Sequence, residues 1–157
     1  MSGNMSEVEK KLKEMGLELP ALPKPAGNYV PFKRVGEMLY LSGQGPRKPD
    51  GTSHTGKVGA EIDVEEAYGH ARIVGLQLLA VAKAAVGDLD KIEFVKLLGM
   101  VNAVPDFRDQ PKVINGCSDL FVELMGERGR HARSAVGMGS LPNNITVEIE
   151  AIVRVHD

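Results

Sequence analysis

The chain ends in an alternation of apolar and polar residues that is typical of a β-strand with one face on a hydrophobic core. Within residues 145–155, the apolar positions of this alternation are Val147, Ile149, Ala151, Val153 and Val155. Two intervening carboxylates, Glu148 and Glu150, therefore project from the opposite face. A shorter apolar segment covers residues 133–138, and the two segments are predicted to pair as a terminal hairpin.

Two stretches have the apolar period of amphipathic helices. The first is predicted to begin after Asp63, an N-cap residue with Glu66 three positions later, and to stop at Gly87. Its apolar face consists mostly of small residues that permit close packing on a sheet: Ala67, Ala71, Val74, Leu78, Ala82 and Ala85. A second helix is predicted over residues 110–126, with Gly126 at its end.

The N-terminal residues predict a short helix followed by extended chain. Ser6 and Glu9 have the spacing of a capping box, and Gly16 marks the expected end of the helix. The apolar stripe of this helix is narrow, so we expect it to lie on the surface of the main fold. The Pro-rich segment 20–31 cannot form the interior of a helix.

The order of the predicted elements indicates one α+β domain over residues 1–157, with residues 1–24 as an N-terminal helix and Pro-rich extension. A hairpin is predicted over residues 29–35 and 38–43. The first long helix, a buried strand over residues 92–101, the second helix and the terminal hairpin complete the chain. This order favours a mixed sheet with the helices stacked on one face.

Composition and charge argue against several classes of function. The 157 residues are 43% apolar and 25% charged, with a net charge of −2 and a pI near 6.1. No basic patch indicates a nucleic acid or a membrane surface as partner. The lone Cys117 rules out an intramolecular disulfide. The sequence has no continuous apolar stretch of about 18 residues and no signal-peptide pattern, so we expect a cytoplasmic protein.

The sequence predicts no metal and no cofactor. Residues 51–58 resemble the start of a phosphate-binding loop, but Val58 replaces the Ser or Thr that would hold Mg²⁺. This segment is therefore predicted to be part of a surface loop over residues 46–60. The histidines lack metal-ligand spacing. His131, two residues before Arg133, is the one that could reach the rim of a cleft.

Arg133 and Glu148 lie on the two predicted terminal strands and are the main candidates for chemistry. An arginine can hold a carboxylate through two hydrogen bonds, and a glutamate can move a proton or orient water. If the strands pair, the two side chains can lie close together. On position alone, a surface arginine in a weak ion pair and a solvated glutamate are the alternatives.

Several segments, taken in order, resemble the YjgF/Rid family, which includes the reactive-intermediate imine deaminases and proteins once called endoribonuclease L-PSP. These segments are GNYVPF…MLYLSGQGP (27–46), FRDQPKVINGCSDLF (107–121), ARS (132–134), LP (141–142) and VEIEAI (147–152). The resemblance covers about residues 25–155, so this chain is similar to an N-terminally extended member. It implies a chorismate-mutase-like fold and a homotrimer with clefts between subunits.

The resemblance also assigns roles to individual residues. It implies that Arg133 holds the carboxylate of a 2-imino acid and that Glu148 positions or activates the attacking water. Further residues are expected at the substrate cleft: Tyr29, Ser42, Asn115 and the backbone of Ala135. Each of these has a structural alternative, such as a packed core tyrosine or a mid-helix asparagine facing water.

This sequence departs from the family pattern at three positions near the expected cleft. Asn28 stands where the deaminases commonly have Pro, Ala135 where they often have Cys, and Ser118 where they often have an aromatic residue. These departures leave the arginine and the glutamate in place and change the pocket for the side chain of the substrate.

Three functions remain open on the sequence. The leading hypothesis is hydrolysis of a small enamine or imine to a 2-keto acid and ammonia, as by a 2-iminobutanoate/2-iminopropanoate deaminase. The second is a non-catalytic trimer that binds a small carboxylate-bearing metabolite such as a 2-keto acid. The third, an endoribonuclease or translation inhibitor, would need a basic groove and stacking aromatics, and the acidic chain has only 4% aromatic residues.

Overall fold

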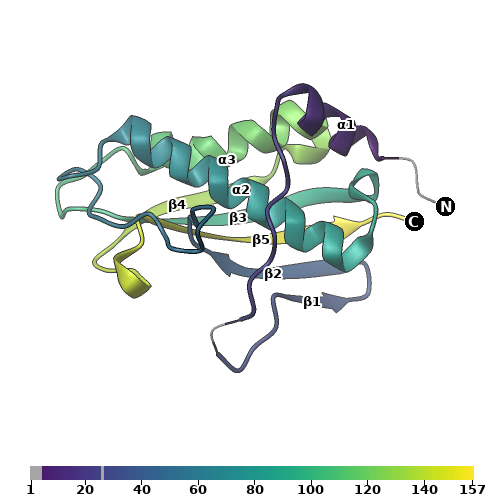
Figure 1. Ribbon diagram of the computed structural model, residues 1–157, viewed down its shortest axis with the longest axis horizontal. Coiled ribbons are helices and arrows are strands. Elements are labelled where there is room, and N and C mark those ends of the chain that lie inside the picture. The colour runs from purple at the N-terminus through teal and green to yellow at the C-terminus, as the bar shows by residue number, and fades with distance from the viewer. Residues whose placement is uncertain (1–4, 26) are drawn as a thin grey trace.

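In a computed structural model, which describes residues 5–25 and 27–157, a five-stranded mixed sheet forms the base of the molecule (Figure 1). The strands in chain order are β1 (Phe32–Val35), β2 (Met38–Gln44), β3 (Ile92–Asn102), β4 (Ala132–Met138) and β5 (Val147–Val155). Their order in the sheet is β1-β2-β5-β3-β4. Only β3 and β4 run parallel, and the other neighbours are antiparallel. The expected hairpin near the N-terminus is confirmed as β1 and β2.

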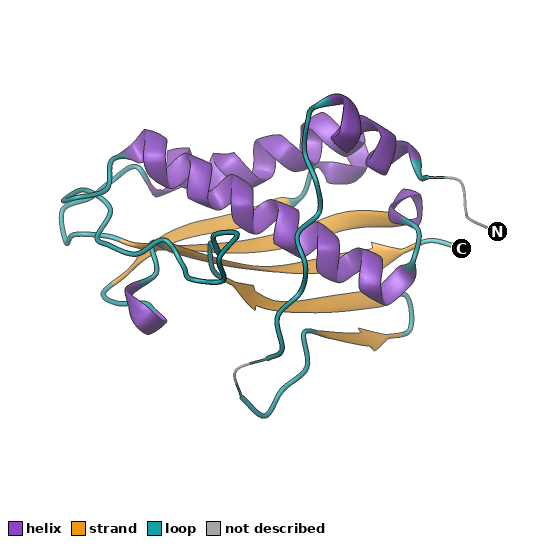
Figure 2. Ribbon diagram, viewed as in Figure 1, coloured by secondary structure: helices purple, strands orange, loops and turns teal. Residues whose placement is uncertain are grey.

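The helices cover one face of this sheet (Figure 2). They are α1 (Glu7–Glu14), α2 (Val64–Val86) and α3 (Gln110–Met125). Three short 3₁₀ turns connect elements: η1 (Leu89–Lys91), η2 (Gly126–Gly129) and η3 (Pro142–Asn144). The expected α+β class, with the long helices on one side of a mixed sheet and a short N-terminal helix, is confirmed.

Local capping chemistry sets the ends of the helices where the sequence predicted them. The Ser6 hydroxyl accepts a hydrogen bond from the Glu9 amide at 3.0 Å, which caps α1. The Asp63 carboxylate accepts one from the Glu66 amide at 2.8 Å, which caps α2. Gly87 ends α2 with a φ of 89°, a conformation that favours glycine.

The N-terminal helix is fixed to the main fold at one end and along one side. The Asp90 carboxylate of η1 accepts from the backbone amides of Glu7 and Val8 at 2.7 and 3.1 Å. These amides lie at the positive end of the α1 dipole, where a carboxylate is stabilising. Val8 and Leu12 are buried beneath the helix. The expected surface position of α1 is thus held by specific contacts.

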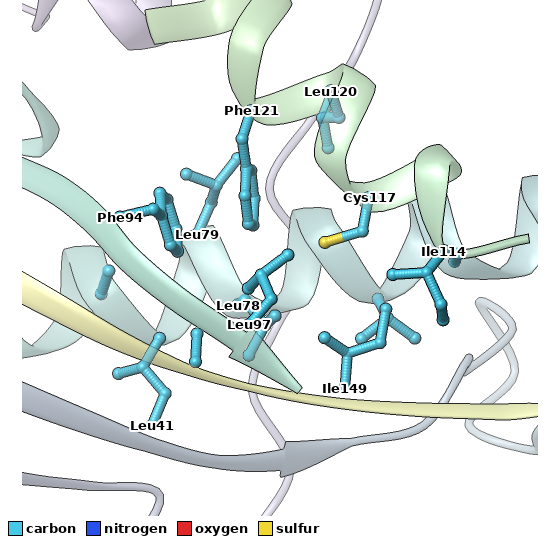
Figure 3. Close-up of a cluster of buried hydrophobic side chains, with 14 of the residues drawn as sticks. Leu41, Leu78, Leu79, Phe94, Leu97, Ile114, Cys117, Leu120, Phe121 and Ile149 are labelled. Atoms are coloured by element: carbon cyan, nitrogen blue, oxygen red, sulfur yellow. The ribbon is translucent and has the colours of Figure 1, made fainter. Parts of the chain in front are cut away.

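The core lies between the helices and the sheet (Figure 3). Phe94 of β3 and Phe121 of α3 stack at its centre, with ring centroids 3.8 Å apart. Cys117 points into the same core, and burial raises the pKa of its thiol. A buried thiol with a raised pKa is a poor nucleophile.

The terminal strands do not form the predicted hairpin. β3 lies between β4 and β5 and pairs with both of them. The reason is topological, because β3, α3 and β4 form a crossover unit in which two parallel strands become neighbours. β5 then fills the other side of β3 as an antiparallel strand. The expectation that pairing would bring Arg133 close to Glu148 is therefore wrong.

The second face of the sheet carries no helix within the described residues and mixes apolar with acidic side chains. The pairing register places Tyr40 beside Ile152, and Met100 between Glu148 and Val136. Tyr40 is 45% exposed and Val136 is 39% exposed. We name this surface the open face.

Within the part of the chain that the structure describes, one helix meets the length and composition of a membrane span, contrary to the expectation of none. This helix is α2, and 56% of its most apolar window is buried inside the protein. Its apolar residues pack against α3 and the sheet, as the residues of a core helix do.

A buried histidine joins α2 to the segment before β5. His70 Nδ1 lies 2.8 Å from Thr146 Oγ1, and the His70 ring stacks on His54 with centroids 4.1 Å apart. Burial, more than the neighbouring His54 and Lys48, lowers the pKa of His70 to about 4. The folded protein therefore holds His70 neutral through the range in which an ordinary histidine becomes charged.

Acidification from pH 6.5 to pH 4 is expected to destabilise the protein through His70. The unfolded chain takes up this proton near pH 6.5, whereas the folded chain does so only near pH 4. The contribution of His70 to stability is thus fully present above pH 6.5 and is lost as the pH falls through this window, by about 3 kcal/mol. Urea unfolding of the wild type and of His70→Gln should be measured at pH 6.5 and at pH 4. The unfolding free energy of His70→Gln should fall less between these pH values than that of the wild type. Equal losses in the two proteins would contradict the prediction.

Candidate functional site

Arg133 lies on the helix side of the edge strand β4. Its position is in register with Leu97 of β3, whose buried side chain faces the helices. From there Arg133 Nη1 donates to Asn115 Oδ1 at 2.8 Å and to Ser118 Oγ at 3.1 Å. Asn115 and Ser118 are three residues apart on α3, so both face the same way. Two acceptors on a rigid helix therefore fix the guanidinium.

A small cavity of about 240 Å³ adjoins this arginine. Its lining residues are Asn115, Ser118, Asp119, Val122, Arg130, His131 and Arg133. Ala135 follows Arg133 by two positions on the same face of β4, is in register with Gly99 and packs on the core. We name Arg133, Asn115, Ser118, His131 and Ala135 the arginine half-site.

Glu148 lies on the open face, in register with Met100 of β3. Its carboxylate covers the backbone of Gly43, where any Cβ would overlap Glu148 Oε2. Gly43 belongs to Ser42-Gly43-Gln44 at the end of β2, where an irregularity shifts the register between β2 and β5. We name this irregular end of β2 the Gly43 turn. Glycine at this position therefore lets the carboxylate lie directly against the backbone, and a larger residue would displace the Glu148 side chain.

The environment of Glu148 makes its carboxylate easier to protonate than that of an ordinary glutamate. Partial burial and, to a lesser extent, the charge of Glu150 raise the pKa of Glu148. A carboxyl group with a raised pKa holds a proton more readily near neutral pH and suits general acid–base work.

Removing Glu150 is expected to lower the pKa of Glu148 in Glu150→Gln without returning it to an ordinary value. Burial is the larger cause of the shift and remains in the variant. A ¹³C NMR titration of the Glu148 carboxyl would measure the change. Glu7→Gln, on exposed α1, is the matched control and should leave the Glu148 titration where it is. An unchanged titration in Glu150→Gln would contradict the prediction.

Tyr29 and Ser42 lie beside the Gly43 turn. The Ser42 hydroxyl donates to the Val30 carbonyl at 2.7 Å, so it anchors the segment that carries Tyr29. Tyr29 is 52% exposed and lines a cavity of about 270 Å³ together with Gly43. We name Glu148, Gly43, Ser42 and Tyr29 the carboxylate half-site.

A buried amide holds the carboxylate half-site on α2. The side chain of Gln77 donates to the Gly45 carbonyl at 2.7 Å and accepts from the Arg47 amide at 3.0 Å. Gln77 is 1% exposed, and its amide satisfies the hydrogen bonds of two backbone groups that would otherwise need water. Both groups lie just after the Gly43 turn. The turn therefore has a fixed position relative to the helix layer.

The two half-sites do not meet within one chain. Arg133 lies on the helix side of β4, whereas Glu148 lies on the open face of β5, with β3 between the two strands. The structure thus brings Asn115 to Arg133, and Tyr29 and Ser42 to the turn beside Glu148. The expected proximity of the arginine and the glutamate is not found in a single subunit.

In the sequence, Ser118 stands out only as a departure from the family pattern, and His131 has no predicted partner. The structure joins them, since Ser118 Oγ lies 2.8 Å from His131 Nε2. The spacing of Asn115 and Ser118 on one helix face was the signal that could have placed Ser118 beside the arginine.

The segment that resembles a phosphate-binding loop is closed by contacts of its own lysine. Lys57 Nζ donates to the Gly139 carbonyl at 2.6 Å and to the Ala103 carbonyl at 3.3 Å. The segment is part of a surface loop as predicted, and its Val58 is buried and pairs with Ala103 beyond β3, which packs this part of the loop on the end of the sheet. Among residues 5–25 and 27–157, no group of three His, Cys, Asp or Glu side chains could hold a metal ion.

Comparison with known proteins identifies the family. A model of the YjgF/chorismate-mutase-like family, described as candidate endoribonucleases, matches residues 9–152. The chain belongs to this family. The proteins that resemble this YjgF family member over almost its whole length include one from a parasite and one from a bacterium. Protein TCP17 of Trypanosoma cruzi is 42% identical over 96% of this chain and 95% of its own length. The crystal structure of Atu1372 from Agrobacterium tumefaciens, described as having unknown function, is 48% identical, with a TM-score of 0.88 over 95% of this chain and 92% of its own.

Two more distant relatives of this YjgF family member carry an activity or a ligand in their descriptions. The 2-iminobutanoate/2-iminopropanoate deaminase of Dermatophagoides farinae is 28% identical over 88% of this chain and 94% of its own length. E. coli TdcF, whose crystal structure contains bound serine, is 26% identical, with a TM-score of 0.63 over 86% of this chain and 93% of its own. Members of the family therefore include a protein named as an imine deaminase and one that binds a small amino acid.

Proposed function

We propose that the protein hydrolyses small 2-imino acids to 2-keto acids and ammonia, in clefts formed between copies of the chain. The observation that carries the proposal is the fixed Arg133. Its Nη1 is committed to Asn115 and Ser118, while Nε and Nη2 make no hydrogen bond to residues 5–25 or 27–157. These groups can therefore receive a carboxylate.

The division of the site supports assembly of the cleft from two subunits. Arg133 stands on an edge strand, and Glu148 stands on the open face, which has exposed apolar side chains such as Tyr40 and Val136. An apolar face without cover is typical of a surface that binds another subunit. In a closed ring of identical chains, the arginine half-site of one copy would face the carboxylate half-site of the next. A homotrimer is the assembly that we propose.

In such a cleft, the chemistry needs positioning and one proton carrier. Arg133 would hold the substrate carboxylate and so place the imine carbon beside the Gly43 turn. Water adds to the carbon of the protonated imine while Glu148 accepts one of its protons, which gives a carbinolamine. Glu148 returns this proton to the nitrogen, the C–N bond breaks as the hydroxyl oxygen forms the keto group, and the hydroxyl proton leaves with ammonia as ammonium. Imines hydrolyse readily in water, so orientation and acid–base assistance suffice.

The test is release of ammonia and pyruvate from freshly generated 2-aminoacrylate. The proposal predicts release faster than in buffer by at least about ten-fold, a modest demand on acid–base catalysis. Release at the buffer rate by a folded, assembled protein would contradict it.

Binding without turnover is the second candidate, favoured by the serine found in the TdcF structure. The same Arg133 would hold the carboxylate of a 2-keto acid or an amino acid. Titration with 2-ketobutyrate by calorimetry separates the two candidates. Saturable binding together with no acceleration of 2-aminoacrylate hydrolysis would identify a binding protein.

A further inference from the structure

Ser118 and His131 form a hydrogen-bonded pair that the proposed imine hydrolysis does not need. Ser118 Oγ lies 2.8 Å from His131 Nε2 and accepts from Arg133 Nη1 at 3.1 Å. His131 Nδ1 lies 2.6 Å from the Gly129 carbonyl oxygen. Ser118 is held on α3, and His131 directly precedes β4, so two packed elements set the geometry of the pair.

The hydrogen-bond partners of Ser118 and His131 allow only one arrangement of their protons. A guanidinium can only donate, so Ser118 accepts from Arg133 and directs its own proton to His131 Nε2. That nitrogen is then the acceptor, and Nδ1 carries the imidazole proton to the Gly129 carbonyl. Burial, more than the charges of Arg133 and Arg130, lowers the pKa of His131. The imidazole is therefore neutral at pH 7 and able to take a proton.

This arrangement has the parts of an activated nucleophile. A hydroxyl contacts a neutral base, and a third group fixes the tautomer of that base. Hydrogen-bond donors for a developing oxyanion stand beside the hydroxyl. They are the Nε and Nη2 of Arg133 and the Nδ2 of Asn115, none of which makes a hydrogen bond within the described residues. Ser118 is partly exposed and lines the cavity of about 240 Å³.

We propose that Ser118 is a nucleophile and His131 its general base, so that the arginine half-site transfers small acyl groups from esters or thioesters to water. Ser118 Oγ forms a bond to the carbonyl carbon as its proton passes to His131 Nε2. The bond from carbon to the leaving oxygen or sulfur then breaks, and His131 gives that atom the proton. Water next adds to the acyl group through the same base, and Ser118 is released with its proton restored.

The size of the cavity limits the substrate class. A volume of about 240 Å³ accommodates an acyl group of a few carbon atoms, so short acyl groups are the substrate class that we assign. Because the nucleophile, the base and the oxyanion donors all belong to the arginine half-site, this activity goes beyond imine hydrolysis and does not use Glu148. The variant Glu148→Gln separates the two proposals. It should lose imine hydrolysis and keep acyl transfer at Ser118, so either proposal can fail without the other.

The experiment is labelling of the intact protein with a small alkyl fluorophosphonate, followed by peptide mass spectrometry and by an assay of 4-nitrophenyl acetate hydrolysis. One label per chain is expected, on Ser118. Ser118→Ala should abolish labelling, and His131→Gln should slow it about 100-fold, the effect of removing a general base. Ser134→Ala, which removes an exposed serine of β4, is the matched control and should label like the wild type.

No label on the folded wild type, or a label that persists in Ser118→Ala, would overturn the proposal. Ser118→Cys provides a second test that does not depend on whether Ser118→Ala folds. If His131 acts as a base, the introduced thiol should react with iodoacetamide faster in Ser118→Cys than in the double variant that also carries His131→Gln. Equal rates in those two proteins would also overturn it, and would leave Ser118 and His131 as a brace for Arg133.

Discussion

Replacing Arg133 with alanine is expected to lower kcat/KM for 2-aminoacrylate hydrolysis about 100-fold or more. The variant loses both hydrogen bonds of the carboxylate clamp, and truncating one partner of such a charge pair costs about 2–5 kcal/mol. Arg133→Lys should recover only part of the activity, because an ammonium lacks the planar fork that fits both Asn115 and a carboxylate. Steady-state kinetics with the three proteins measures the effect.

Arg130→Ala is the matched control for this loss. Arg130 lines the same cavity, but its side chain is exposed and pairs with Glu127 at 2.9 Å. Exposed pairs of this kind contribute little, so a change of less than about three-fold is expected. A wild-type rate in Arg133→Ala, or an equal loss in Arg130→Ala, would refute the assigned role of Arg133.

Gly116→Ala is expected to destabilise the fold strongly, although it replaces only one hydrogen by a methyl group. A Cβ at Gly116 of α3 would overlap the Tyr68 carbonyl oxygen and lie 3.1 Å from the Arg72 amide nitrogen, both in the backbone of α2. Backbone atoms cannot move aside as a flexible side chain can. The helices must separate, at a cost of about 3 kcal/mol or more, the upper range for overpacking.

Gly69→Ala on α2 provides the opposite result from the same chemical change. A Cβ there meets no heavy atom within 4 Å, and alanine favours a helix over glycine by about 1 kcal/mol. Chemical denaturation should therefore show a lower unfolding free energy for Gly116→Ala and a slightly higher one for Gly69→Ala. Similar stabilities for the two variants would contradict the tight helix contact.

The sequence predicted those features that depend on neighbouring residues. Helix α2 begins after Asp63 and ends at Gly87 as predicted, because capping and a positive φ are local properties. The alternation in residues 147–155 likewise placed Glu148 on the face away from the core. Such features are encoded within a few positions along the chain.

Features that depend on strand order could not be predicted in this way. β4 and β5 are consecutive, yet β3 separates them, and this arrangement follows from the crossover through α3. As a result, Arg133 and Glu148 lie on different faces of the sheet. The contact of Ser118 with His131 depends on how η2 returns the chain after α3, and no local pattern encodes that return.

The central claim, that one catalytic cleft takes Arg133 from one copy and Glu148 from another, is tested most directly by mixing two inactive chains. Arg133→Ala and Glu148→Gln proteins are co-expressed with different tags, and assemblies that contain both are isolated by sequential affinity purification. Native mass spectrometry verifies their composition.

We expect these mixed assemblies to regain 2-aminoacrylate hydrolysis, while each variant alone stays inactive. In a ring of three that contains both chains, one cleft in three joins an intact Arg133 with an intact Glu148, so about a third of the wild-type rate should return. Mixed assemblies that remain as inactive as their parents would show that the two residues do not act across a subunit boundary.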